Sequence, residues 1–487
     1  MNMRSHFVIA TYGSSGDVFP FIEIGRYLVS RKYKVSFITT PWFENVVKTG
    51  GMKYVPFGTM KQAVDLLNDS AIWHPIKGLN VIWAKGVQPN IHTVRLCVES
   101  MESREDIVIL CNSLMMPLAD LARTHRKDLR VALFYQQPTA IRTHYGRLTL
   151  GAITLPRLPR FLTQLLYSAI DALFFDKGIV PVLNNERSKL GLAPIAHFRP
   201  YVCSSADAYI TLFPEWYAPP KPDYPKPLVS GDFVFYRSSK DSLSDELAKF
   251  LDAGPPPILF TVGTPTQHVK KFFQIAVDVI KRLNARAVVL TGFRDQLPAD
   301  LPASVLWQTY VPFNEFLPRA SIVVHHGGMG TFAEAGRAGI PQLIVPFSHD
   351  HFENARIITD LGIGESIGLH SLTSNKLFKK LSHLQRSETI KARCVNVACN
   401  FRSSLTINQI ADMTLAAIGL PSDNVAALAE SDRESVLELL STLASKGLKF
   451  SVEGNDLNCY APKGMLTEKL RESITQNKSQ LIDMLRT

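Results

Sequence analysis

A histidine, three glycines and a threonine stand together at the end of one apolar run of this sequence. The run covers residues 320–324, which is long enough for a buried strand, and the heptapeptide HHGGMGT follows at residues 325–331. A glycine turn between a strand and a helix leaves backbone N–H groups unpaired at the positive end of the helix dipole. Such a turn can hold a phosphate or diphosphate, and His326 and Thr331 could add side-chain donors. These residues therefore predict an anion-binding site.

The elements that position this turn follow a pattern that the chain uses twice. A strand is followed by a glycine turn, a helix and a second strand, and this order predicts a parallel sheet covered by helices. Near the N-terminus the turn has the sequence GSSGD at residues 13–17. It lacks the GxGxxG spacing of dinucleotide-binding dehydrogenases, which argues against a nicotinamide enzyme. The predicted strand, helix and strand cover residues 320–324, 332–338 and 342–345 in one unit, and 6–11, 19–31 and 34–39 in the other.

Composition limits the class of protein further. With 487 residues, 46% of them hydrophobic, the chain should form two or three domains with large cores. The net charge of +10 is spread along the chain rather than gathered in a basic block, so we expect no nucleic-acid partner. The six cysteines show neither CxxC spacing nor a disulfide framework, which predicts a reduced, cytoplasmic setting. No apolar stretch reaches the ~20 residues that a transmembrane helix needs, so no transmembrane segment is expected.

The turn at residues 325–331 and the residues after it resemble the donor-binding signature of the family-1 nucleotide-sugar glycosyltransferases. The likeness is to bacterial members of the rhamnosyl, macrolide and glycopeptide types, which have the GT-B fold of two Rossmann-like, doubly wound α/β domains. The resemblance implies that His326 and Thr331 hold the diphosphate and that Glu334 holds the ribose hydroxyls. It also implies that Asp350 and its neighbour read the sugar; the neighbour is usually Gln, so the sugar stays open. The matching residues are His326, Gly328, Gly330, Thr331, Glu334, Asp350 and His351.

Three further segments extend the resemblance. The sequence GSSGDVFP at residues 13–20 resembles the N-terminal turn of bacterial members, several of which use the Asp at this place as general base on the acceptor hydroxyl. Asp17 is also placed to be the N-cap of a helix beginning near Phe19, and one residue could fill both roles. The turn at Gly263-Thr264 corresponds to one that faces the diphosphate from the other side. Tyr310-Val311 corresponds to the place where relatives stack an aromatic ring on the nucleobase and bond it through the backbone; a surface aromatic is the alternative.

No metal ion or other cofactor is expected beside the nucleotide-sugar substrate. The chain lacks the DxD motif that holds a divalent metal on the diphosphate, and a helix N-terminus with a histidine can replace that metal. His349, Asp350 and His351 are potential zinc ligands, but side chains one or two residues apart on a loop form a poor cage.

Two other stretches bear on the domain organisation. Residues 155–175 are apolar and aromatic at near-helical spacing, which suits a core helix or a lid over a greasy, lipid-like acceptor. The proline-rich stretch that ends at Gly231 predicts a crossing between domains. We predict an acceptor-binding domain at 1–218, a linker at 219–231 and a donor-binding domain at 232–420.

The remainder, residues 431–487, predicts a separate α+β domain. Residues 431–434 form a capping box before a helical face, residues 449–452 and 457–460 alternate as a hairpin, and helices follow from Thr467. This unit resembles the docking domains first recognised at the N-terminus of the tubulysin synthetase subunit TubC. The resemblance is carried by residues 448–453, 460–464 and 481–485, and it implies a nonribosomal peptide or polyketide synthetase subunit as partner. An ordinary stabilising subdomain is the alternative.

Together these features predict an inverting glycosyltransferase. It would move a hexose-type sugar from a UDP- or dTDP-sugar to a hydroxyl of a peptide, polyketide or lipid acceptor, with recruitment through residues 431–487. Two alternatives stay open, a tethered nucleotide-binding scaffold without turnover and a nucleotide-sugar epimerase. The Gly-Asp turn at residues 16–17 argues against the epimerase.

Overall fold

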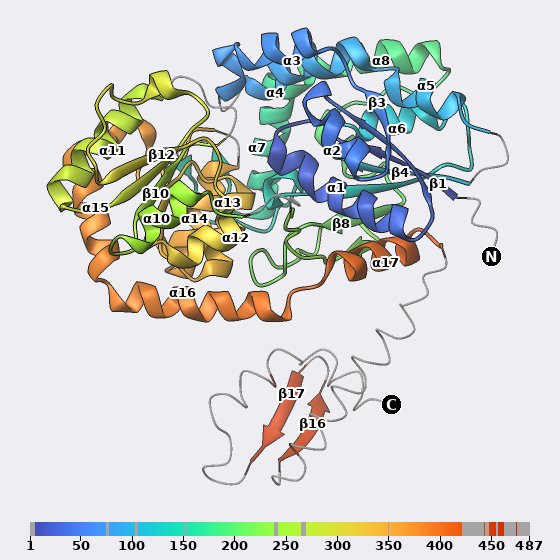
Figure 1. Cartoon of the computed structure of the whole chain (residues 1–487). Coiled ribbons are helices and arrows are strands. Elements are labelled where there is room, and N and C mark those ends of the chain that lie inside the picture. Colours follow the sequence, from blue (N-terminus) through green and yellow to red (C-terminus); the bar gives the residue numbers. More distant parts are fainter. Residues whose placement is uncertain are drawn as a thin grey trace. The chain divides into compact units, whose positions relative to one another are not determined.

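The structure is a computed structural model, and it divides into two units, residues 1–418 and 419–487. The residues that it describes are 5–74, 77–102, 106–150, 153–237, 242–263, 269–348, 350–420, 443, 448–453, 456–461 and 474. Two parallel sheets form separate halves of the first unit, each with helices around it (Figure 1).

The first sheet has seven parallel strands in the order β3-β2-β1-β4-β5-β8-β9. Because both faces of a parallel sheet are covered, its strands are apolar almost throughout, and Phe7, Val8 and Ile9 of the central β1 are fully buried. The chain leaves β1 towards β2 on one side and β4 towards β5 on the other, so the strand order reverses between β1 and β4. The strands are β1 (Ser5–Ala10), β2 (Lys34–Thr39), β3 (Lys53–Pro56), β4 (Asp106–Asn112), β5 (Arg130–Tyr135), β8 (Ala208–Thr211) and β9 (Leu228–Val229).

The second sheet has six parallel strands in the order β12-β11-β10-β13-β14-β15. Here the order reverses between β10 and β13. In open α/β sheets, ligands bind beyond the carboxyl ends of the strands at such a reversal. The strands are β10 (Ile258–Thr261), β11 (Ala287–Leu290), β12 (Val305–Gln308), β13 (Ile322–His325), β14 (Gln342–Ile344) and β15 (Gly364–Ser366). Two doubly wound sheets confirm the predicted fold class.

Helices near the predicted domain boundary return to the first half. In Figure 1, α16 (Glu388–Asn400) leads away from the second sheet and α17 (Ile407–Ala417) lies against the first. The Tyr27 hydroxyl of α1 (Ser15–Ser30) donates to Asp412 of α17 at 2.6 Å. Strand β9, which pairs with β8, comes from the stretch expected to be a linker. The first half is therefore completed by residues from both the predicted linker and the predicted second domain.

The apolar segment at 155–175 does not form a core helix. It holds α7 (Arg160–Ile170), whose one buried residue is Thr163, and the π-helical turn η6 (Asp171–Phe175), whose one buried residue is Asp171. Four of its large apolar side chains, Phe161, Leu165, Leu173 and Phe174, are exposed instead. The core-helix alternative was wrong because apolar content at helical spacing does not say whether another element covers the apolar face.

In the second unit the predicted hairpin is confirmed. Strands β16 (Lys449–Glu453) and β17 (Asp456–Tyr460) are antiparallel, with Lys449 opposite Tyr460. The side chains of Leu443 and Leu448 are buried. The capping box at 431–434 and the helices expected from Thr467 fall outside the described residues, Ile474 excepted. In the described part of the chain, no helix has the length and apolar character to cross a membrane.

Candidate active site

The turn after β13 separates two neighbouring histidines into different environments. His325 ends the strand, is fully buried, and lies with its Nε2 3.0 Å from Oε1 of Gln342. The N–H of Gly327 donates to its Nδ1. Burial, with the neighbouring His326, lowers the pKa of His325 to about 3, so this ring is a neutral structural group. His326, by contrast, lines a cavity.

The His326 imidazole sits between two glycine turns. A Cβ on Gly263 would lie 2.8 Å from its Cε1, and a Cβ on Gly328 would lie 2.5 Å from its Nε2. Gly263 also has a φ of +83°, so both positions need glycine to leave room for this ring. The ring of His351 packs edge-on against it, with centroids 4.7 Å apart.

His326 is placed to form hydrogen bonds as a neutral ring. Burial lowers its pKa to about 4, so near neutral pH it offers a hydrogen bond rather than a positive charge. Its Nδ1 is buried and has no hydrogen-bond partner among the described residues. An orphaned buried nitrogen beside a glycine turn fits a site completed by a ligand.

The helix that follows the turn, α13 (Met329–Ala338), begins without a side-chain cap. Gly328 is its N-cap and has no side chain that could accept from the N–H groups of the first turn. Gly330, Thr331 and Glu334 lie on the first two turns and line the same cavity. Arg337 donates to the Glu334 carboxylate at 2.6 Å and so fixes its orientation. Open N–H groups at the positive end of the dipole suit an anionic ligand.

Asn354 connects this turn to the second acidic residue of the motif. Its Nδ2 donates to the Gly327 carbonyl at 2.7 Å and to Oδ2 of Asp350 at 3.0 Å, and its Oδ1 accepts from the Tyr217 hydroxyl. Burial, reinforced by the charge of Asp17, raises the pKa of Asp350 to about 7. Near neutral pH this carboxyl is protonated for part of the time, so it can donate as well as accept a hydrogen bond.

Asp17 lies in the turn after β1, in the other half. Helix α1 begins at Ser15, so Asp17 occupies the third helical position, and the expectation that it is the N-cap was wrong. Ser14 is the N-cap, and its N–H donates to Oδ2 of Asp17 at 2.7 Å, the bond by which these two residues form a capping box; its hydroxyl also donates to that oxygen, at 3.0 Å. A Cβ on Gly13 would lie 2.2 Å from that oxygen, so this close approach requires glycine. Burial raises the Asp17 pKa, and the Ser14 hydrogen bonds oppose that rise.

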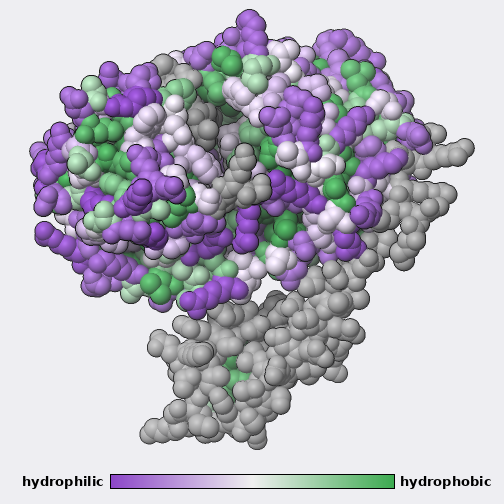
Figure 2. All heavy atoms as spheres, in the orientation of Figure 1, coloured by the Kyte–Doolittle hydropathy of each residue, from purple (hydrophilic) through white to green (hydrophobic). Residues whose placement is uncertain are grey.

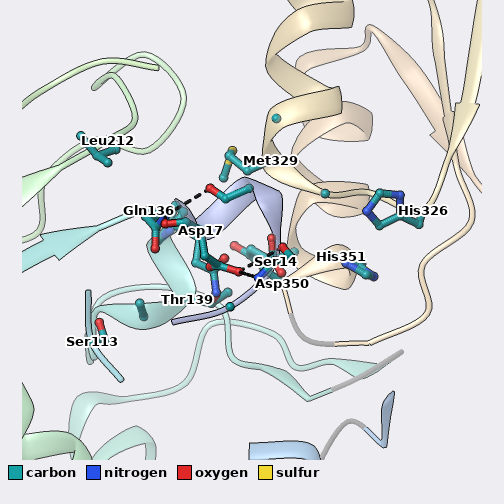
Figure 3. A pocket seen from close by; sticks show the side chains of 18 of the residues that line it. Ser14, Asp17, Ser113, Gln136, Thr139, Leu212, His326, Met329, Asp350 and His351 are labelled. Carbon is teal, nitrogen blue, oxygen red and sulfur yellow. Dashed lines mark hydrogen bonds between the residues drawn. The ribbon is translucent and has the colours of Figure 1, made fainter. Parts of the chain in front are cut away.

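One cavity of about 2130 Å³ brings the two turns together. Figure 3 shows Asp17 and Asp350 next to each other, with His326 and His351 beyond Asp350. The cavity wall includes eleven of the predicted site residues: Asp17, Gly263, Tyr310, Val311, His326, Gly328, Gly330, Thr331, Glu334, Asp350 and His351. Thr264 and His349 fall outside the described residues. Tyr310 is 59% exposed on the loop after β12 and lies in the cavity wall.

Several residues of the site were missed in the sequence. Asn354 stands one helical turn after Asp350, and that i, i+4 spacing was the available signal. Gln136 was not missed, because the resemblance implied an acceptor-facing loop at residues 136–138; its Nε2 donates to the carbonyls of Gly16 and Asp17, at 3.1 Å and 2.8 Å. Tyr217 reaches the second half from the proline-rich stretch, and nothing local in the sequence indicates this contact.

Across the described ranges, no group of three His, Cys, Asp or Glu side chains is arranged to hold a metal ion. Where the two turns meet, the polar groups of the cavity include an open helix N-terminus, a neutral imidazole and the carboxyl groups of Asp17 and Asp350. This set can hold a diphosphate by hydrogen bonds and dipole, and it can take a proton from a hydroxyl at Asp17.

Comparisons with known proteins agree with this geometry. Residues 275–416 match the family described as erythromycin biosynthesis protein CIII-like, C-terminal domain, and residues 436–487 match the TubC N-terminal docking domain. A sterol 3-beta-glucosyltransferase of Arabidopsis thaliana is 25% identical over 421 residues, which are 81% of this chain and 65% of that protein. The vancomycin aglycone glucosyltransferase of Amycolatopsis orientalis is 30% identical over 232 residues, 46% of this chain and 53% of that one.

The chain thus spans less than two thirds of the length of either relative. Among solved structures, CalG4, the calicheamicin glycosyltransferase, aligns with a TM-score of 0.63 at 18% identity, over 86% of this chain and 99% of that one. Such a likeness supports the fold, and the relatives and structural neighbours are glycosyltransferases. Residues 275–416 are therefore similar to the C-terminal domain of the erythromycin CIII-like proteins, residues 436–487 are similar to the TubC N-terminal docking domain, and residues 1–418 have the GT-B fold of the structural neighbours.

Proposed function

We propose that this protein is an inverting glycosyltransferase that moves a hexose-type sugar from a UDP- or dTDP-sugar to an acceptor hydroxyl. The observation that carries the proposal is the meeting of two turns in one cavity. The turn after β13 offers an open helix N-terminus and His326, and the turn after β1 offers the carboxylate of Asp17. An anionic leaving group and a general base would then have separate places.

In the proposed reaction, the donor diphosphate binds at the N-terminus of α13 with His326 and Thr331. The acceptor hydroxyl gives its proton to Asp17 as its oxygen bonds to the anomeric carbon. The bond from that carbon to the diphosphate oxygen breaks on the opposite face, so the sugar inverts. Charge that develops on the departing diphosphate is stabilised by the helix dipole and the histidine N–H, and Asp350 and His351 contact the sugar.

The test is incubation of the full chain with a panel of UDP- and dTDP-sugars, followed by mass spectrometry of released and bound nucleotide. Donor hydrolysis or transfer that is lost in His326→Ala and Asp17→Asn is the expected result. Tight nucleotide binding without any turnover in the panel would instead assign a scaffold role, and interconversion of two sugars on the nucleotide would assign an epimerase.

The acceptor is proposed to be a peptide or polyketide product of an assembly line, reached through residues 431–487. The match to the TubC docking domain and the β16–β17 hairpin, with Tyr460 62% exposed, support this part. An exposed strand edge can add a segment of a partner subunit as a further strand. Truncation after Leu420 should leave donor hydrolysis intact and slow transfer to a subunit-bound acceptor. Equal rates for both chains would contradict recruitment.

The six free cysteines fit the reduced cytoplasm as the compartment.

A further inference from the structure

The segment formed by α7 and η6 exposes a concentration of large apolar side chains. Phe161, Leu165, Leu173 and Phe174 are 69%, 65%, 57% and 39% exposed. Phe161 and Leu165 are one helical turn apart, so they share a face. On the face of the molecule in Figure 2, hydrophobic residues lie in small patches among hydrophilic ones. Four large apolar groups exposed within fourteen residues are unusual for a surface in contact with water alone, so this segment is a candidate contact surface.

The charges in this segment and in the residues directly beside it are sorted by sign. Within residues 154–178, all of which the structure describes, the acidic residues are Asp171 and Asp176, and both are buried. Asp171 is paired with Arg142, and Asp176 accepts hydrogen bonds from the His197 ring and the Phe198 N–H. The basic residues, by contrast, are exposed: Arg157, Arg160 and Lys177. Apolar groups and positive charges of this region are therefore exposed to solvent, whereas its two carboxyl groups are buried.

The same segment forms part of the wall of the large cavity. Arg157, Arg160, Tyr167, Ile170, Phe174 and Phe175 line it. Phe174 is one of the exposed apolar residues and also lies in the cavity wall, so the apolar segment reaches the cavity. The segment is anchored beside the cavity, because Asn80 of α4 (Gly78–Ile82) donates a hydrogen bond to the Phe174 carbonyl.

We propose that the α7–η6 segment is a membrane-docking surface that binds lipid surfaces bearing anionic headgroups. A helix with exposed Phe and Leu side chains flanked by Arg and Lys is the pattern that lies in a bilayer interface, with the apolar groups among acyl chains and the cations at the headgroups. Exposed cations without exposed carboxylates favour an anionic surface. Delivery of an acceptor from the lipid into the cavity rests on the proposed glycosyl transfer, but the docking itself does not.

The test is flotation of the full chain with vesicles of phosphatidylcholine alone and of phosphatidylcholine mixed with phosphatidylglycerol. The native protein should bind the anionic vesicles at least about tenfold more tightly than the vesicles of phosphatidylcholine alone, and added salt should reduce this preference. Phe161→Gln/Leu165→Gln should lose about tenfold or more of the affinity for the anionic vesicles. Arg157→Gln/Arg160→Gln should keep weak binding but lose the preference between the two vesicle types.

Val395→Gln is the matched control, because Val395 is an apolar side chain that is 57% exposed on another helix, α16. It should float like the native protein. Absence of native binding to anionic vesicles, or equal binding of native protein and Phe161→Gln/Leu165→Gln, would overturn the proposal. A native dimer that this variant converts to a monomer would also overturn it, by assigning the surface to a second copy. Since flotation needs no turnover, vesicle binding without any sugar transfer would leave docking standing while the proposed function fails.

Discussion

The two glycine turns of this molecule share a local design and differ in what satisfies the helix that follows. Each comes after a central strand, β1 or β13, at the reversal point of its sheet. In the first, Ser14 and Asp17 form a capping box, so the helix start holds its own carboxylate. In the second, Gly328 stands at the N-cap and the positive end of α13 is open. The same strand–turn–helix unit thus holds an internal anion in one half and offers a place for an external one in the other.

The largest effect should come from removing the charge of the internal anion. Asp17→Asn keeps a side-chain oxygen for the cap and removes the proposed base, so transfer should fall by ~10²–10⁴-fold with the melting temperature nearly unchanged. Steady-state rates and thermal unfolding measure the two effects. The control is Asp65→Asn, an exposed carboxylate paired with Lys61. A variant that loses stability and keeps its rate would assign Asp17 a capping role alone.

A substitution in the turn after β13, the proposed site of the external anion, should reduce the rate nearly as much. His326→Ala removes a hydrogen-bond donor to the departing diphosphate, and kcat should fall by ~10²–10³-fold, the loss typical of one such donor. Single-turnover rates with saturating donor provide the measurement. His383→Ala, at an exposed histidine on α15 (Ser374–Arg386), serves as control. An unchanged kcat in the first variant would show that the second turn does not hold the leaving group.

Asp350 tests how burial of a carboxyl group in the cavity affects the pH dependence of stability. Its folded-state pKa of about 7 lies above its ordinary value of 3.8, so the unfolded chain releases the proton first as pH rises. The stability that the protonated group contributes is therefore lost between about pH 4 and pH 7. Asp350→Asn removes this loss. The difference in the free energy of unfolding between the variant and the native protein should therefore shift by ~3 kcal/mol in favour of the variant from about pH 4 to pH 8, as measured by denaturant unfolding. Parallel pH profiles for the two proteins would contradict the assigned pKa.

Gly328→Ser gives the second turn the cap of the first and so tests the comparison itself. A Cβ there would lie 2.5 Å from Nε2 of His326, and the new hydroxyl can accept from the open N–H groups. Binding of UDP or dTDP should weaken ~10-fold, equal to about 1.4 kcal/mol, by calorimetry. Gly368→Ser, at the start of the short helical turn η9 (Leu369–Ser371), is the control. Tighter or unchanged nucleotide binding in Gly328→Ser would argue against an anion at this helix start.

The smallest effect is expected at the first cap. Ser14→Ala removes the hydroxyl that bonds Asp17 and should cost ~1 kcal/mol of stability. That hydrogen bond lowers the Asp17 pKa, so its loss should raise the pKa. Because the base works when deprotonated, the acidic limb of the pH–rate profile should move to higher pH. A limb that stays in place would mean that another group sets it.

The two turns could be predicted from the local sequence, because a glycine turn between a strand and a helix depends on only a few neighbouring residues. It misplaced the start of α1 by four residues, since Ser14 was not weighed as N-cap against Asp17. It could not indicate that Tyr217 reaches Asn354, or that α17 packs on α1, because such contacts depend on how the two halves meet. The exposure of α7 was also beyond it, since apolar spacing is the same for a covered and an uncovered face.

The central claim is that the turn after β13 holds the diphosphate and the turn after β1 holds the base. It is tested most directly by calorimetric titration of UDP and dTDP into three proteins, the native chain, His326→Ala and Asp17→Asn. The account predicts that one nucleotide binds the native chain and Asp17→Asn with the same affinity, because the base does not touch the diphosphate. It predicts that His326→Ala binds that nucleotide at least ~10-fold more weakly, a difference of about 1.4 kcal/mol. Equal affinity in all three proteins, or a loss in Asp17→Asn alone, would contradict it.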